Sequence, residues 1–226
     1  MSLGDVKSYV ENASIMLKGN YTTGLAYRGT NLTLKESRIV LTSSEVGNET
    51  VWEGFGVESV GVKIIKGNAT VFNNTIATQG KGIHIAGNES NADVEGNFIN
   101  IVGNTDENAF AIYVNGAGDV SIVENDVDFQ GDTNGTAINN AVFIFNTNNT
   151  LITGNKFVLD LASSFVPWVE IPAGSWNYVS FPLSEGIVVE ESDGVTFDSN
   201  NVTVQYGEIV GDFDTIYSVD FKNSNN

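Results

Sequence analysis

The sequence has no cysteine and only one histidine among its 226 residues. The lack of cysteine excludes disulfide bonds, a thiol nucleophile and cysteine zinc sites, and it leaves the compartment open. A single histidine also excludes a histidine-rich metal site. No apolar run approaches the ~18 residues of a membrane span and no signal peptide stands at the start, so direct membrane insertion is not expected. The opening Met1–Gly4 is typical of an expression leader, which predicts a segment taken from a longer protein.

Positive charge is scarce. The chain carries 10 Lys and Arg against 28 Asp and Glu, for a formal net charge of -18. An acidic surface of this size repels nucleic acid and anionic membranes, so neither is an expected partner. Neither an EF-hand loop nor the nonapeptide calcium repeat is present, so the sequence predicts no metal site and no cofactor.

A repeat dominates what is present. Its template is an apolar residue, two spacers, asparagine, one spacer and a second apolar residue, and five copies centre on Asn74, Asn97, Asn125, Asn155 and Asn200. Degenerate copies centre on Ser37 and, more weakly, on Ala13. A short alternating strand begins 12 to 14 positions before each centre, whereas the centres themselves stand 23, 28, 30 and 45 residues apart.

The tightest spacing predicts the architecture. Three short strands in about 23 residues suit one rung of a parallel β-helix, at roughly 3.3 Å per residue. We therefore expect an all-β solenoid of about seven rungs with apolar residues stacked inward. Asparagine in a turn can adopt the left-handed conformation and bond to backbone, so the five asparagines are expected to form a structural ladder at one corner. A leucine-rich repeat would need L-x-x-L-x-L runs that are missing, and a β-propeller would need repeats of about 40 residues.

The repeat motifs also resemble a known family. VFNNTI, VEGNFI, IVENDV and ITGNKF are similar to the right-handed, single-stranded parallel β-helix repeats of the pectate-lyase-like superfold, above all to adhesin-like surface proteins of methanogenic archaea and bacterial secreted proteins. The resemblance runs from about Leu25 to Val204. It implies the fold more specifically than the function, because this superfold carries lyases, hydrolases, phage tailspikes and inert stalks.

The variable spacing predicts where the insertions lie. Residues 1–226 are expected to form one domain, with a cap or first rung over 5–23 and insertions over 42–60 and 163–185. Because the distance from the first strand to the asparagine is nearly constant, every long insertion falls after the asparagine strand and leaves from one corner. Insertions on one side of a repeat array often mark its binding face, although surface loops also tolerate length without any function.

An aromatic column is the main candidate for ligand contact. Strand alternation should place His84, Tyr113 and Phe143 outward on successive rungs, in a column that also holds Ala26, Lys63, Val188 and Tyr217. Aromatic rings supply a stacking face for sugars, and Trp168 or Trp176 is expected to close over them. The alternative is that the aromatic segment after Ser163 buries Tyr113 and Phe143 as a satellite core.

Catalytic residues are not predicted. A lyase needs a base and a cation, yet the two arginines, Arg28 and Arg38, fall in different strands. A glycoside hydrolase needs two carboxylates ~5–10 Å apart, and the best pair is Asp93 with Glu95. Asp126 should instead form an ion pair with Lys156. A polysaccharide-cleaving enzyme therefore remains only the alternative to a non-catalytic module.

Ten Asn-x-Ser/Thr sequons point to export, because chance would supply about half as many. We therefore expect an extracellular or cell-surface module, adhesin-like, whose partner is a glycan or another surface protein. The sequence does not predict its oligomeric state. The sequons start at Asn12, Asn20, Asn31, Asn48, Asn68, Asn73, Asn88, Asn134, Asn148 and Asn201.

Overall fold

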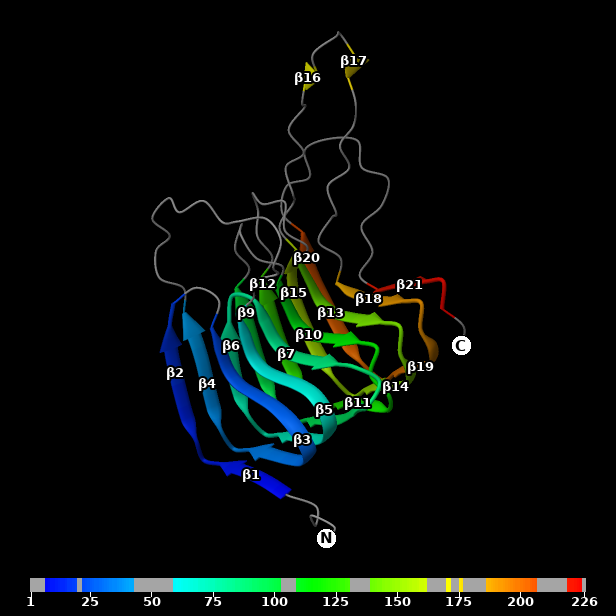
Figure 1. Cartoon of the computed structure of the whole chain (residues 1–226). Helices are drawn as coiled ribbons and strands as arrows, with labels where there is room; N and C mark the ends of the chain where they lie inside the picture. Colours follow the sequence, from blue (N-terminus) through cyan, green and yellow to red (C-terminus); the bar gives the residue numbers. More distant parts are fainter. Residues whose placement is uncertain are drawn as a thin grey trace.

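The structure is a computed structural model that describes residues 7–19, 22–42, 59–102, 109–130, 139–161, 170–171, 175–176, 186–206 and 219–224. These ranges are all-β and contain no helix. Two parallel sheets curl around a shared apolar interior (Figure 1). The described antiparallel pair is β16 (Glu170–Ile171) with β17 (Ser175–Trp176). The predicted all-β class and parallel pairing are confirmed.

The strands lie in three rows, of which two belong to one sheet and the third forms a sheet of its own. This third row has seven parallel strands. They follow one another in chain order, each from the next passage of the chain (Figure 1): β2 (Ser14–Lys18), β4 (Arg38–Thr42), β6 (Thr75–Thr78), β9 (Phe98–Val102), β12 (Asp126–Gln130), β15 (Lys156–Leu161) and β20 (Asn201–Tyr206).

The other sheet has twelve strands in two rows. Its long strands β3 (Thr23–Lys35) and β5 (Val60–Phe72) contribute to both rows, since the start of β5 pairs with β7 and its end with β8. The first row continues through β7 (Lys81–Ala86), β10 (Ala109–Asn115), β13 (Asn139–Phe145), β18 (Ile187–Glu190) and β21 (Val219–Lys222). The second row is β1 (Lys7–Glu11), β3, β5, β8 (Ser90–Glu95), β11 (Val120–Val123), β14 (Asn148–Thr153) and β19 (Asp193–Asp198).

Strand register keeps equivalent repeat residues beside one another. In the first row Ile83 pairs with Ile112, in the second Val94 pairs with Ile122, and in the third Ile99 pairs with Val127. Side chains alternate across a strand, so these residues all face the interior, where they are fully buried. A slip by one residue would turn a whole apolar set to solvent, which is why the register is strongly specified.

A column of small residues lets the two sheets approach closely. It begins with Gly24, Gly61 and Gly82 and continues with Ala111. A Cβ built on Gly61 would lie 2.6 Å from the Gly82 carbonyl oxygen and 2.7 Å from Cγ2 of Ile76 in the third row. Glycine is thus required there by space and not by backbone conformation.

The corner between the second and third rows has a repeated backbone shape. The residue immediately before each repeat centre has φ between 49° and 65°: Asn12, Glu36, Asn73, Gly96, Glu124, Gly154 and Ser199. None of the five ladder asparagines has a positive φ, so the expectation that they adopt the left-handed conformation is wrong. The preceding residue makes the turn and leaves the asparagine side chain pointing inward.

The two predicted insertions lie mostly outside the residues that the structure describes, whereas the predicted cap lies mostly within them. The proposed cap over 5–23 contains β1 and β2, which pair with β3 and β4. Most of the predicted insertion over 42–60 and nearly all of 163–185 lie outside the described residues. The described part of 163–185 consists of β16 and β17.

Gly61→Ala should lower the free energy of unfolding by about 1–3 kcal/mol, because the added methyl group overpacks the contact between the sheets. Chemical denaturation measures the change. Ala26→Ser, which adds one atom on the exposed face of β3, should change it by no more than about 0.5 kcal/mol. Equal effects of the two substitutions would contradict the close approach of the sheets at Gly61.

Candidate functional site

The five repeat asparagines, Asn74, Asn97, Asn125, Asn155 and Asn200, form a continuous hydrogen-bonded ladder, which we call the inner ladder. The backbone N–H and the Nδ2 of Asn97 both donate to Oδ1 of Asn125, each at 3.0 Å. The same pair of bonds joins Asn74 to Asn97, Asn125 to Asn155, and Asn155 to Asn200, at 2.8–3.0 Å. One side-chain oxygen therefore accepts two bonds from the preceding turn.

The side-chain nitrogen of each asparagine also serves its own corner. Nδ2 of Asn125 donates to the carbonyl of Val123 at 3.0 Å and to that of Val94, one turn earlier, at 2.9 Å. These groups are buried, and an unpaired buried amide or carbonyl costs about 1–3 kcal/mol. The inner ladder is thus part of the core and is not available to a ligand.

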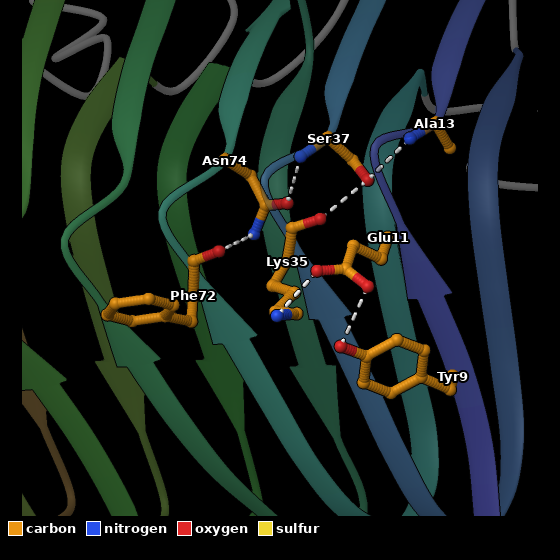
Figure 2. A network of polar contacts seen from close by, with 7 residues as sticks. All are labelled: Tyr9, Glu11, Ala13, Lys35, Ser37, Phe72 and Asn74. Atoms are coloured by element: carbon orange, nitrogen blue, oxygen red, sulfur yellow. Dashed lines mark hydrogen bonds and ion pairs between the residues drawn. The ribbon is translucent and has the colours of Figure 1, made fainter.

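The inner ladder changes character at its N-terminal end (Figure 2). The backbone N–H of Ser37 donates to Oδ1 of Asn74 at 2.9 Å, and that of Ala13 donates to Oγ of Ser37 at 3.1 Å. Ser37 therefore fills the place of an asparagine, as the degenerate repeat predicts. Ala13 has no side-chain acceptor, and the ladder ends there.

A surface network lies beside this end of the ladder (Figure 2). Nζ of Lys35 is 2.5 Å from Oε1 of Glu11, and the hydroxyl of Tyr9 donates to Oε2 of the same carboxylate at 3.0 Å. The bond from Lys35, followed by that from Tyr9, lowers the pKa of Glu11 below its usual value. The network fixes the orientation of the Tyr9 ring, which is 58% exposed.

The predicted aromatic column is present in the first row. Lys63, His84, Tyr113, Phe143 and Val188 are register partners, but the next position is Asp220 and not Tyr217, which lies outside the described residues. The Tyr113 ring stacks on Phe143 with centroids 5.7 Å apart, and it meets the His84 ring edge-on at 4.8 Å. The structure therefore brings together three of the five residues predicted to contact a ligand.

The rings of this column are packed against other side chains and are only partly exposed to solvent. His84 is only 8% exposed, and Tyr113 and Phe143 are half-buried. Phe110 packs against both Tyr113 and Phe143, and Nζ of the buried Lys81 lies 4.0 Å from the Tyr113 ring centroid. Such a cation–π contact is strongest where water is excluded.

The remaining two residues of that prediction are not placed against the column. Trp168 lies outside the described residues. Trp176 pairs with Glu170 in the β16–β17 ribbon, and its side chain is not described. The closing of a tryptophan over the column thus stays a prediction.

A second polar column, on the outer face of the second row, was missed by the sequence reasoning. We call it the outer ladder: Asn31, Asn68, Asn91, Asp119 and Asn149. Nδ2 of Asn91 donates to Oδ1 of Asn68 at 2.9 Å, and the Asp119 N–H donates to Oδ1 of Asn91 at 2.9 Å. Each member stands six positions before a centre of the repeat, a constant spacing that could have identified it.

A shallow groove of about 550 Å³ lies over this face. The outer-ladder residues from Asn31 to Asp119 line it, and the neighbouring outward column adds Thr33, Thr70 and Asp93. Tyr9 and Lys7 close its N-terminal end. The groove is therefore lined by amides, hydroxyls, two carboxylates, a lysine and one exposed aromatic ring.

The described ranges give little support for a metal site, a membrane-spanning helix or a catalytic carboxylate pair. There, no three His, Asp or Glu side chains gather closely enough to hold a metal ion, and no helix is long and apolar enough to cross a membrane. The predicted Asp126–Lys156 ion pair is confirmed, with Nζ 3.0 Å from Oδ1. Asp93 and Glu95, the best carboxylate pair of the sequence, are both exposed on β8.

Asn125→Ala should lower the free energy of unfolding by about 1–3 kcal/mol, because it leaves the N–H of Asn97 and the carbonyls of Val94 and Val123 without these partners. Urea denaturation measures the loss. The matched control is Asn100→Ala on the outward side of β9, expected to cost no more than about 0.5 kcal/mol. If both variants unfold at the wild-type midpoint, the inner ladder does not stabilise the fold.

His84 predicts a pH dependence of stability. Burial, followed by the charges of Lys81 and Lys63, lowers the pKa of His84 from 6.5 to about 3. Between these values the unfolded chain binds a proton that the folded protein does not, so the free energy of unfolding decreases as the pH falls. It should decrease by about 2 kcal/mol between pH 7 and pH 5.

Denaturation at several pH values compares the wild type with His84→Leu. His84 is the only histidine, so the variant should lose most of the slope between pH 6.5 and 5, where few carboxylates titrate. The same slope in both proteins would show that His84 is not held neutral by burial.

No family model, curated protein or solved structure matches the chain. The geometry of the described residues is therefore the basis for assigning its function.

Proposed function

We propose that this chain is a right-handed parallel β-helix of about seven turns, of the pectate-lyase-like kind, that binds a neutral or basic glycan along its outer groove without cleaving it. Three rows of parallel strands in constant register support the helix. The inner ladder supports it as well, because an asparagine recurs at the same position of every turn from Asn74 to Asn200.

The groove is the observation that carries the glycan assignment. Its amides and hydroxyls recur from strand to strand, and parallel strands stand about 4.8 Å apart. A regular row of donors and acceptors suits the repeated hydroxyl groups of a linear polysaccharide. The exposed ring of Tyr9 adds an apolar stacking face whose orientation is already fixed by Glu11.

Charge narrows the class of sugar. Asp93 and Asp119 lie in the groove, and the whole chain carries a net charge of -18. This field repels uronates and other acidic sugars and favours neutral or amino sugars.

An extracellular or cell-surface location fits the sequons. Six of the ten sequon asparagines are exposed in the described ranges: Asn12, Asn68, Asn73, Asn88, Asn148 and Asn201. Exposed acceptors of this kind suit an exported, adhesin-like protein. The proposal therefore keeps the resemblance to adhesin-like surface proteins.

The aromatic column stays a second predicted contact surface. A lysine ammonium lies over both the Tyr113 and the Tyr9 ring, but His84 is buried and Tyr113 is half-buried, so the column offers less exposed ring area than Tyr9. No observation in the described ranges favours the polysaccharide-cleaving alternative. The hydrogen bond from a lysine lowers the pKa of Glu11 and of Glu89, whereas a general acid needs a raised pKa.

A glycan array followed by titration calorimetry tests the proposal. Tyr9→Ala and Asp93→Ala, both at exposed positions, should each weaken binding to the recognised glycan about tenfold or more while the unfolding midpoint stays close to that of the wild type. Asn100→Ala, outside the groove, should bind as the wild type does.

Two results would overturn the groove assignment. One is wild-type protein that binds no neutral or amino-sugar glycan on the array. The other is loss of binding in Tyr113→Ala but not in Tyr9→Ala, which would place the ligand on the aromatic column instead.

A further inference from the structure

The groove is lined by two columns of side chains whose charge changes along their length. One column runs across neighbouring strands through Lys7, Asn31, Asn68, Asn91 and Asp119. The other runs beside it through Tyr9, Thr33, Thr70 and Asp93. Each column therefore leads from a residue of β1, through amides or hydroxyls, to a carboxylate on β8 or directly before β11.

No cation of the described ranges neutralises these two carboxylates. Asp93 is exposed and makes no hydrogen bond or ion pair there. Oδ1 of Asp119 accepts from Nδ2 of Asn149 at 3.1 Å, and Oδ2 has no partner in those ranges. Lys7, the one cation among the described residues that line the groove, stands four strand spacings from Asp119, roughly 19 Å. That exceeds the Debye length of about 8 Å at physiological salt, so Lys7 does not offset the negative charge of Asp93 and Asp119.

An ammonium group complements this acidic part of the groove better than a hydroxyl group does. It can donate three hydrogen bonds, and it supplies the positive charge that Asp93 and Asp119 lack beside them. Hydrogen bonds between charged partners are about twice as strong as those between neutral ones. Acetylation of the nitrogen of an amino sugar removes the charge and two of the three donors. The free and the acetylated forms of one sugar should therefore differ in affinity.

The amide-lined part of the groove suits the uncharged groups of the same polymer. Nδ2 of Asn91 donates to Oδ1 of Asn68 at 2.9 Å, and Nδ2 of Asn68 donates to Oδ1 of Asn31 at 3.3 Å. Each of these two amide nitrogens keeps a second hydrogen for a ligand, and the hydroxyls of Thr33 and Thr70 can donate or accept. Contacts of this kind add affinity without distinguishing a free from an acetylated amine.

Building on the glycan binding proposed for this groove, we infer that its ligand is an amino-sugar polymer with free amino groups, whose ammonium groups lie beside Asp93 and Asp119. Lys7 repels an ammonium group, so the charged sugars lie over β8 and β11 and not over β1. A polymer that is acetylated at every nitrogen is bound less tightly than its free-amine form.

Titration calorimetry at low ionic strength tests the inference with hexamers of glucosamine and of galactosamine, each compared with its N-acetylated form. The protein is produced without N-glycosylation, because Asn31 and Asn68 are sequon asparagines within the groove. At least one free-amine hexamer should bind the wild type about tenfold more tightly than its acetylated form does.

Two double variants locate the charges responsible. Asp93→Asn/Asp119→Asn keeps the side-chain shapes and should abolish the preference for the free amine. Glu124→Gln/Asp128→Asn removes two exposed charges outside the groove and should keep the preference. Unfolding midpoints close to that of the wild type show that both variants are folded.

Three results would overturn the inference: no binding of either free-amine hexamer, acetylated hexamers that bind as tightly as the free amines, or equal loss of preference in the two double variants. The last would show attraction to the acidic protein as a whole. Wild-type protein that binds neutral glycans on an array but no free amine overturns this inference alone. Wild-type protein that binds no glycan on the array overturns the groove proposal as well.

Discussion

The bend between the second and the third row buries polar groups of the backbone, and these need hydrogen-bond partners inside the fold. Where the chain passes from the second row to the third, a backbone N–H and two carbonyl groups lie within hydrogen-bond distance of the side chains of the corner asparagines. An asparagine side chain satisfies them because it carries an acceptor and two donors. Oδ1 of Asn97 accepts from Asn74, and Nδ2 of Asn97 lies 2.8–3.0 Å from Oδ1 of Asn125 and from the carbonyls of Val71 and Glu95, so three acceptors share its two hydrogens. Serine keeps only part of this set, as Ser37 shows.

The corner then decides what lies on the outside. Once the asparagines are in register, residues a fixed number of positions away are in register too, whatever their chemistry. The outer ladder stands six positions earlier and the inward apolar residues three positions earlier or two later. Length varies by up to two residues between the first and second rows, and most of it varies between the third row and the next first-row strand, where the undescribed intervals after β4, β9, β12, β15 and β20 fall. The groove over the outer ladder therefore lies on strands that are held in one register.

The sequence predicted what depends on this periodicity. It located the inner ladder, the first-row column from Lys63 to Val188 and the Asp126–Lys156 pair, because each needs only register. It did not predict the burial of His84, which depends on Lys81, on Tyr113 in the next turn and on the rings packed around it. The outer ladder was not predicted, because Asn31 and Asn68 were assigned to sequons and Asp119 interrupts the run of asparagines. The turn conformation was placed one residue late, since the sequence alone does not show which residue of the corner takes the positive φ.

The most direct test of the corner is amide hydrogen exchange followed by NMR. The backbone N–H groups of Asn74, Asn97, Asn125 and Asn155 each donate to a neighbouring asparagine oxygen, and all four asparagines are buried. They should therefore exchange only through opening of the whole fold, as slowly as the central strand amides of Ile99 and Val127. Exchange of these four amides at the rates of ordinary exposed turns would contradict the ladder and, with it, the stacked arrangement of the chain.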